Sequence, residues 1–199
     1  MTPYLRTICL LLWLAACGGS GGGGGGIDPR LTRLDIYEAQ KLRVLGDPGA
    51  GVMGMDMTAD DSVPTTGALS LAGFATLRIE IGTDPLVLFG DADLQIDFDT
   101  SAAQGAVTNV FGARAGADIA DYGGVIDLQS TAVGQDMPLT YAGELSGAGQ
   151  TLGFAGVMTG VLLGNPVSAF AGGDLEAQVD HDGTIRDGTV VIALEAVSP

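Results

Sequence analysis

Hydrophobic and polar residues alternate along much of this 199-residue chain, and the period of the alternation changes near Pro64. The clearest stretch spans residues 90–99, where apolar side chains fall on one face of an extended segment and polar ones on the other. The apolar set is Ala92, Leu94, Ile96 and Phe98, and the polar set is Asp91, Asp93, Gln95, Asp97 and Asp99. A half-buried antiparallel strand requires this two-residue period. We expect the aspartates to form a solvated outer face, because like charges at alternate positions repel one another.

Weaker segments of the same kind occur at short intervals after Pro64, separated by turn-forming clusters such as residues 147–149 and 180–183. They span residues 67–81, 105–111, 124–130, 139–146, 151–162, 168–179 and 188–196. About eight strands with tight turns and internal glycines favour a small closed barrel over a sandwich. The sequence therefore predicts a mainly all-β fold with a barrel domain over residues 64–199. The side chains expected to fill its interior are Leu69, Leu71, Leu94, Ile96, Val107, Leu145, Phe154 and Val157.

Residues 27–46 have a different period. The apolar positions recur at spacings of three and four, which predicts an amphipathic helix whose stripe is Leu31, Leu34, Tyr37 or Glu38, Leu42 and Leu45. Residues 28 and 29, Asp followed by Pro, form a suitable start, and the glycine at position 46 is a suitable stop. Residues 47–63, rich in Gly, Asp and Pro, are expected to be a connector.

The N-terminus has the pattern of a bacterial export signal. A positive charge and a short apolar run precede the sequence Leu14-Ala15-Ala16-Cys17. Lipoprotein signals are cut and acylated at such a cysteine, so we expect residues 1–16 to be a signal peptide and Cys17 to carry lipid. Residues 17–26, mostly glycine, are expected to be a flexible tether about 15–18 Å in r.m.s. length. Gly18, rather than an aspartate, favours sorting to the outer membrane.

The charge balance limits the possible partners. The chain has 24 acidic and 8 basic residues and a formal net charge of −16. This balance excludes a basic groove for nucleic acid and a polybasic contact with anionic lipid. We expect attachment to the membrane by the lipid anchor alone, together with a soluble acidic surface.

The sequence contains few candidate catalytic residues. His181 is the only histidine, and it lies in a predicted turn, where a solvated side chain is the expected state. A catalytic serine would need a histidine beside it, and no Gly-x-Ser-x-Gly motif occurs. We therefore expect a protein that is not an enzyme and has no cofactor.

Two groups of residues resemble weak metal sites. Met53, Met55 and Met57 alternate, and thioethers in this arrangement suit Cu(I). We favour apolar contacts between the connector and the barrel instead, because methionine fills irregular gaps. Asp180, Asp182 and a third aspartate at position 187 surround a glycine as in a calcium loop, but the twelfth position lacks the required glutamate. No metal site is predicted.

Several segments resemble barrel domains of the transferrin-binding protein B type. They are residues 63–73 (VPTTGALSLAG), 90–98 (GDADLQIDF) and 105–109 (GAVTN), with a later match at 160–172 (GVLLGNPVSAFAG). Leu71 stands where that family has tyrosine, and Leu163 and Asn165 replace an aromatic and a small residue. The resemblance implies an eight-stranded antiparallel up-and-down barrel displayed on the surface of a Gram-negative bacterium. Relatives of this kind capture host proteins or small iron-bearing ligands.

These observations predict a surface-exposed outer-membrane lipoprotein that acts as a binding or adhesion module through its barrel loops. The alternatives are a carrier of a small hydrophobic or metal-bearing solute and a structural coat lipoprotein of the envelope. A binding module should expose an apolar or aromatic patch among residues 82–90, 112–123 and 131–138. Tyr122 and Met137 are the candidates for that patch. The sequence does not identify the partner, which could be a protein or a small solute.

Overall fold

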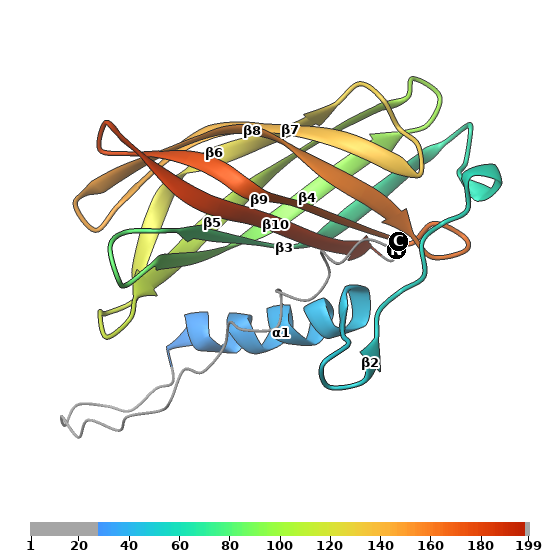
Figure 1. The fold of residues 1–199 in the computed structure, drawn as a ribbon. Coiled ribbons are helices and arrows are strands. Elements are labelled where there is room, and N and C mark those ends of the chain that lie inside the picture. Colours follow the sequence, from blue (N-terminus) through green and yellow to red (C-terminus); the bar gives the residue numbers. More distant parts are fainter. Residues whose placement is uncertain (1–27, 198–199) are drawn as a thin grey trace.

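The computed structural model describes residues 28–197 and consists of a closed barrel with one helix on its outer surface (Figure 1). The expected signal peptide, Cys17 and the expected tether lie outside the described residues. The barrel strands are β3 (Ala68–Ile79), β4 (Leu86–Asp97), β5 (Ala102–Arg114), β6 (Ala120–Ser130), β7 (Asp136–Gly147), β8 (Gln150–Leu163), β9 (Ala169–His181) and β10 (Thr184–Ala196). Each strand pairs antiparallel with its neighbour in the chain, and β10 pairs with β3. The prediction of an eight-stranded up-and-down barrel is therefore confirmed.

Alternation of side chains explains how the barrel is filled. In β4, Leu88, Ala92, Leu94 and Ile96 point inward and are almost completely buried, and Phe98 continues the series just beyond the strand. Apolar side chains from all eight strands form one continuous interior core. Val157 was expected in this core, but the expectation is wrong, because its side chain is 58% exposed. The inward positions of β8 are the even-numbered ones, such as Phe154 and Met158.

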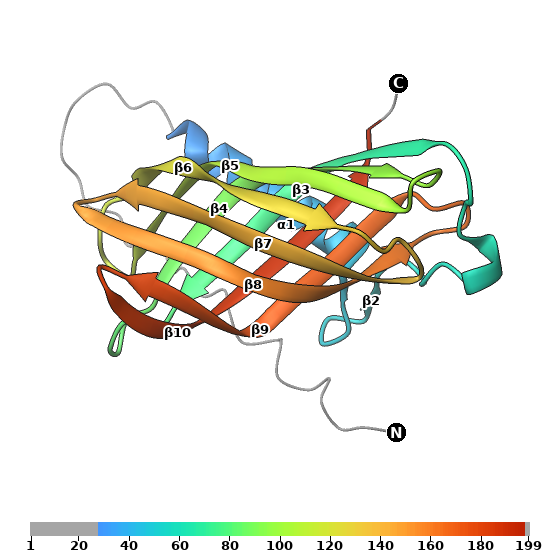
Figure 2. The same ribbon diagram turned by 90° about the horizontal axis from the view of Figure 1, so that it is seen from above.

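The predicted N-terminal helix is α1 (Pro29–Val44), which begins as the sequence suggests. The Asp28 side chain accepts a hydrogen bond from the Arg30 backbone N–H at 2.9 Å, and Pro29 occupies the first turn. Figures 1 and 2 show α1 against the outside of the barrel, alongside β3 and β10. No helix among residues 28–197 is both long and apolar enough to cross a bilayer.

The buried face of α1 matches the predicted stripe only in part: Tyr37 is buried and Leu34 packs against the barrel, as the spacing predicts. Leu31 and Leu45 are exposed, whereas Tyr37, Gln40 and Val44 are buried. Gln40 donates a hydrogen bond to the Ala72 carbonyl at 2.9 Å across Gly73, where any side chain would collide with it. The helix therefore rests on a part of the barrel wall where glycine allows a close approach, and this contact helps to select the face that is buried.

A second apolar cluster joins α1 to the outer wall. The ring of Tyr37 stacks on Phe74 with centroids 5.1 Å apart and lies 6.5 Å from Phe111. A bulge in β5 at Asn109, which has a φ of 51°, accompanies the shift in register that turns Phe111 outward. The wall under α1 is therefore apolar although it lies outside the barrel.

A polar network surrounds this cluster and corrects the expectation of a solvated aspartate face. Asp91 accepts hydrogen bonds from the Tyr37 hydroxyl, from Asn109 Nδ2 at 2.9 Å and from Arg33 Nη2 at 2.9 Å. Burial alone would raise the pKa of Asp91, but these three donors outweigh it and lower the pKa. Asp93, the next outward residue of β4, is exposed as expected.

The connector runs from the end of α1 to the first barrel strand. It contains the short strands β1 (Gly46–Asp47) and β2 (Val52–Met53) and the 3-10 turn η2 (Asp60–Ser62). Thr58 is completely buried and donates a hydrogen bond to the Gly164 carbonyl at 2.7 Å. This contact fixes the connector across the β8–β9 loop.

The barrel has two ends, which we name by their distance from the start of α1. The proximal end consists of the loops at 80–85, 115–119, 148–149 and 182–183. Arg30 lies in the first turn of α1, and its Nη1 atom is 3.3 Å from Asp121 Oδ1 at this end. The distal end consists of the loops at 98–101, 131–135 and 164–168 and of the connector. Figure 1 shows α1 running along the barrel from the proximal to the distal end.

Candidate functional site

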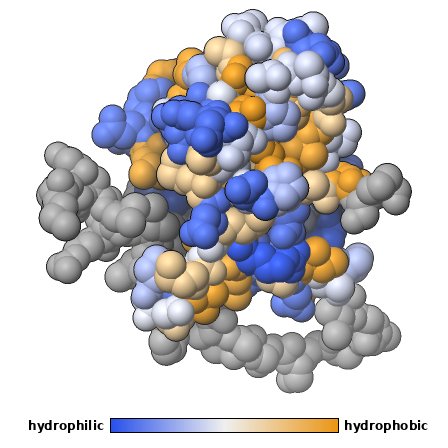
Figure 3. Space-filling view, turned by 90° about the vertical axis from the view of Figure 1, so that its right-hand side faces the viewer, coloured by the Kyte–Doolittle hydropathy of each residue, from blue (hydrophilic) through white to orange (hydrophobic). Residues whose placement is uncertain are grey.

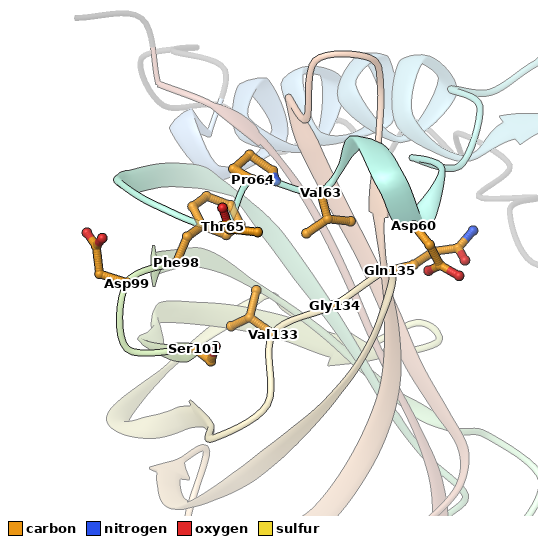
Figure 4. Close-up of a pocket in the computed structure, with 10 residues that line it drawn as sticks. All are labelled: Asp60, Val63, Pro64, Thr65, Phe98, Asp99, Ser101, Val133, Gly134 and Gln135. Carbon is orange, nitrogen blue, oxygen red and sulfur yellow. The ribbon is translucent and has the colours of Figure 1, made fainter.

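A pocket of about 380 Å³ opens at the distal end between three segments of the chain (Figure 4). The segment leading into β3, the β4–β5 turn and the β6–β7 loop each contribute to it. We call it the distal pocket, and its lining residues are Asp60, Val63, Pro64, Thr65, Phe98, Asp99, Ser101, Val133, Gly134 and Gln135. Figure 3 views the molecule from this end and shows apolar and strongly polar residues reaching the same surface.

The floor of the distal pocket is apolar. Phe98 is 6% exposed and closes the barrel interior, and Val63 and Val133 pack against the same interior core. Figure 4 shows the side chains of Val63, Val133 and Phe98 around one common space. The Phe98 backbone N–H donates to the Gly67 carbonyl at 2.9 Å, which ties the β4–β5 turn to the segment that enters β3. The floor is therefore built on a hydrogen-bonded part of the barrel rim.

The sides of the distal pocket are acidic. Asp60 and Asp99 are exposed and lie on opposite sides of it in Figure 4. Asp99 also accepts a hydrogen bond from the Gly67 backbone N–H at 3.0 Å. The lining contains no lysine or arginine, because the arginines carried by the barrel strands, Arg78, Arg114 and Arg186, all lie toward the proximal end. The distal pocket thus combines an apolar floor with uncompensated negative charge.

The expected loop patch is only partly correct. Residues 131–138 contribute to the distal pocket, whereas 82–90 and 112–123 lie toward the other end of the barrel. Tyr122 and Met137 do not form an exposed patch, because they are 3% and 0% exposed and point into the barrel. Their alternation with Ile126 and with Leu139 places them on the inner face of β6 and β7, a signal that is present in the sequence.

The proximal end contains a chain of polar side chains inside the barrel mouth. His181 ends β9 and does not have the solvated environment expected of a turn residue: its side chain is 17% exposed. Its Nε2 lies 2.8 Å from Gln150 Oε1, and Gln150 Nε2 donates to the Tyr122 hydroxyl oxygen at 2.7 Å. Burial raises the pKa of Tyr122, and the hydrogen bond from Gln150 only partly offsets this effect. The sequence analysis did not identify this chain, because its members are far apart in the sequence.

A second pocket, of about 450 Å³, opens in the barrel wall beside α1, where the pairing of β5 with β6 is interrupted. Its charged lining residues are Arg33 and Asp121. Arg33 is bound to Asp91, to the Tyr37 hydroxyl at 2.8 Å and to the Asn109 carbonyl at 3.1 Å, and it lies over the Phe111 ring at 4.6 Å. These charges are engaged in fixing the helix, so we assign this pocket a structural role.

The three methionines of the connector have different environments. Met53 and Met57 are 85% and 52% exposed, and Met55 packs against the helix–barrel cluster. Only Met55 makes the apolar contact that was favoured for the set. Within residues 28–197, no group of three or more His, Cys, Asp or Glu side chains is arranged to hold a metal ion. The lipidation of Cys17 lies outside the described residues and stays a prediction.

Comparison with solved structures finds a protein whose fold is similar to that of this chain. No known protein family and no curated protein sequence matches the chain. Among solved structures, the chain is similar to the vaccine antigen transferrin binding protein B from Haemophilus parasuis Hp5, with a TM-score of 0.47 and 15% identity. The similarity covers 72% of this chain and 29% of that protein. The protein found in this way is of the type that the sequence motifs resemble, and this chain spans less than a third of its length.

Proposed function

We propose that the protein is a non-enzymatic binding module, anchored in the outer membrane by lipid on Cys17 and displayed at the cell surface. The position of the distal pocket is the observation that carries this proposal. The tether predicted at residues 17–26 joins the described chain at the start of α1, which contacts the proximal end at Asp121. A protein held there presents its distal end to partners. The pocket is therefore in a suitable place for recognition.

The packing of the interior favours a module that binds at its surface over a carrier. The large inward side chains Tyr141, Phe154 and Phe170 are buried together with aliphatic residues from every strand. An eight-stranded barrel has an interior that side chains can just fill. The two pockets described above lie at the end of the barrel and in its outer wall, and neither is a ligand chamber within the core.

The chemistry of the distal pocket favours a basic protein partner. Lysine and arginine side chains have apolar stems that pack on hydrophobic surface and a charged head that remains at the rim. Val63, Phe98 and Val133 would contact the stem, and Asp60 and Asp99 would attract the head. Because the chain as a whole carries a charge of −16, it would also attract a basic partner at long range.

Two probes with the same butyl stem test this chemistry. In NMR titrations of the purified lipoprotein in detergent, n-butylguanidinium should move the methyl signals of Val63 and Val133 and approach saturation. Pentanoate should move them far less. Asp60→Asn should weaken the binding of the cation about threefold to tenfold, because a charge-assisted contact is lost. Asp93→Asn is the matched control, since it removes the same charge from the outer wall and should leave binding unchanged.

Equal binding of both probes, or equal weakening by the two substitutions, would refute cation recognition in the distal pocket. Surface display is tested separately. Protease added to intact cells should degrade the protein, and Cys17→Ser should release it from the membrane fraction. Protection until the outer membrane is permeabilised would contradict surface display, and a Cys17→Ser variant that stays with the membrane would contradict the anchor.

A further inference from the structure

Arg186 is an unpaired arginine at the proximal end of the barrel. It lies opposite Val179 in the β9–β10 ladder, and Val179 is a buried residue of the interior core, so Arg186 belongs to the inward-facing row. Its Nε atom is completely buried and has no hydrogen-bond partner. Every other lysine and arginine within residues 28–197 has an ion pair or a hydrogen bond, whereas Arg186 has neither. Arg186 as a whole is only half-buried, but a buried N–H donor without an acceptor is costly, and such groups commonly mark the place of a missing partner.

A second donor without an acceptor faces the same mouth. The chain from His181 through Gln150 ends on the Tyr122 hydroxyl, whose oxygen accepts from Gln150 Nε2. The hydroxyl hydrogen has no acceptor among residues 28–197. Gly147 makes room for this arrangement, because a side chain at that position would press on the Tyr122 ring. The inner mouth therefore contains a neutral, protonated phenol and a guanidinium, both able to donate.

Among residues 28–197, the inward positions at the proximal strand ends carry no carboxylate. The inward positions at the ends of the strands are occupied by Ile79, Arg114, Tyr122, Gln150, His181 and Arg186, together with Leu86 and Leu145. Arg114 is engaged with the carbonyls of Ile81 and Asp84 in the β3–β4 loop. The acidic residue Asp182, in the β9–β10 turn, lies beside His181. It accepts a hydrogen bond from the Thr151 backbone N–H at 2.8 Å and lies 3.6 Å from His181 Nε2.

We propose that the inner mouth of the proximal end is a binding site for a small carboxylate. The Arg186 guanidinium supplies the charge, and a planar carboxylate matches the paired N–H groups of arginine. The Tyr122 hydroxyl, which Gln150 holds in place, is a second and neutral donor at the same mouth. The site is independent of the distal pocket, because the two lie at opposite ends of a filled barrel.

The arginine side-chain signals provide a direct test. The purified lipoprotein in detergent is titrated with acetate at constant ionic strength, and the Nε–Hε signals of the arginines are followed by NMR. The Arg186 signal should move and approach saturation, and the Arg78 signal should not move. Arg186→Gln should weaken acetate binding at least about tenfold, because the charge-assisted contact is lost. Arg78→Gln removes the same charge on the outer side of the neighbouring strand β3 and should leave binding unchanged.

The results of this titration distinguish a carboxylate-binding site from an Arg186 guanidinium that is only hydrated. An Arg186 signal that stays fixed with acetate would show that water satisfies the guanidinium, and it would overturn the proposal. Equal effects of the two glutamine substitutions would overturn it as well, since they would indicate only a general charge effect. Binding of inorganic phosphate without binding of acetate would refute the carboxylate specificity. A far-ultraviolet spectrum like that of the natural protein would show that the Arg186→Gln variant is folded.

Discussion

The two ends of the barrel share one backbone design but differ in the residues that close them. At the distal end, Phe98 is the last inward residue after β4, and it plugs the interior beneath acidic loops. At the proximal end, Tyr122, Gln150 and His181 cross the mouth as a hydrogen-bonded chain, with Arg186 on the next strand. An apolar plug creates a pocket outside the core, whereas a polar closure leaves donors facing inward. The same barrel therefore carries acidic side chains around a pocket at one end and an unpaired arginine at the other, and we propose opposite ligand charges for the two ends.

This difference shows that the closed-barrel fold does not determine which side chains occupy its two ends. Strand pairing satisfies the backbone polar groups around the ring, so the last inward position of each strand is free to vary. A residue there packs on the core from one side and meets water from the other. At the distal end this position holds the apolar Phe98 ring, and at the proximal end such positions hold the polar side chains of Tyr122, Gln150 and His181.

The largest effect should come from removing the distal plug. Phe98→Ala deletes a ring that is 6% exposed and should lower the free energy of unfolding by about 3–4 kcal/mol, because buried apolar surface is lost and a cavity is left. Chemical denaturation measures this change. The substitution should also abolish binding of n-butylguanidinium in the distal pocket. A loss below about 1 kcal/mol would contradict the assignment of Phe98 as a plug.

A pair of glycine substitutions sharpens the comparison between the ends. A Cβ atom added at Gly147 would lie 2.4 Å from the Asp121 carbonyl and 2.9 Å from the Tyr122 ring. Gly147→Ala should therefore cost about 1–3 kcal/mol and disturb the polar chain. Gly134, in the distal loop, has only the Asp136 carbonyl near its Cβ position, at 3.7 Å, so Gly134→Ala should be close to neutral. Thermal unfolding measures the destabilisation caused by each substitution. Equal melting temperatures of the two variants would refute the expected difference between the ends.

The fold was largely predictable from the sequence because the residues of a barrel strand alternate between its inner and outer faces. Each strand alternates in burial, so the segments at 67–81 and 90–99 indicated β3 and β4 directly. Val157 was misassigned because its segment contains apolar residues on both faces, and hydrophobicity alone did not set the register. The helix was found by its spacing and its start, but its buried face was found only in part, since Tyr37 was in the predicted stripe and Val44 was not. Gln40 could not be recognised as a contact residue without the wall of the barrel at Gly73.

The candidate sites were far less predictable, because each is built from segments distant in the sequence. The distal pocket joins residues 60–65, 98–101 and 133–135, and no local pattern links these segments. His181 was seen as a turn residue because its partner, Gln150, is 31 positions away. Asp91 looked like one of several exposed aspartates, and contacts with the docked helix and with Asn109 on β5 distinguish it from Asp93. Pairing across the barrel, rather than composition, creates these environments.

A smaller effect should follow from breaking the polar chain at the proximal end. Tyr122→Phe removes the hydroxyl that accepts from Gln150 and should lower the free energy of unfolding by about 1 kcal/mol. Gln150→Leu and the double variant complete a thermodynamic cycle. A coupling energy of about 0.5 kcal/mol or more would show that the two residues act together. Strict additivity would contradict the hydrogen-bonded chain, and the end would then be closed by packing alone.

The smallest effect concerns the helix that links the two ends. The pKa of Asp91 is lowered in the folded protein by hydrogen bonds from Tyr37, Asn109 and Arg33, which outweigh the opposing effect of burial. A depressed carboxylate pKa stabilises the fold above its unfolded value of about 3.9, and this stabilisation is lost as the pH falls below it. The attachment of α1 should therefore weaken below about pH 4, which hydrogen exchange of the α1 amides can measure. Asp91→Asn should speed this exchange at neutral pH and remove much of its acid dependence, whereas Asp93→Asn should leave both unchanged. If Asp91→Asn instead exchanged like the natural protein at neutral pH, the apolar cluster around Tyr37 would suffice to fix α1. The position of the chain start at the proximal end would then rest on packing rather than on charge.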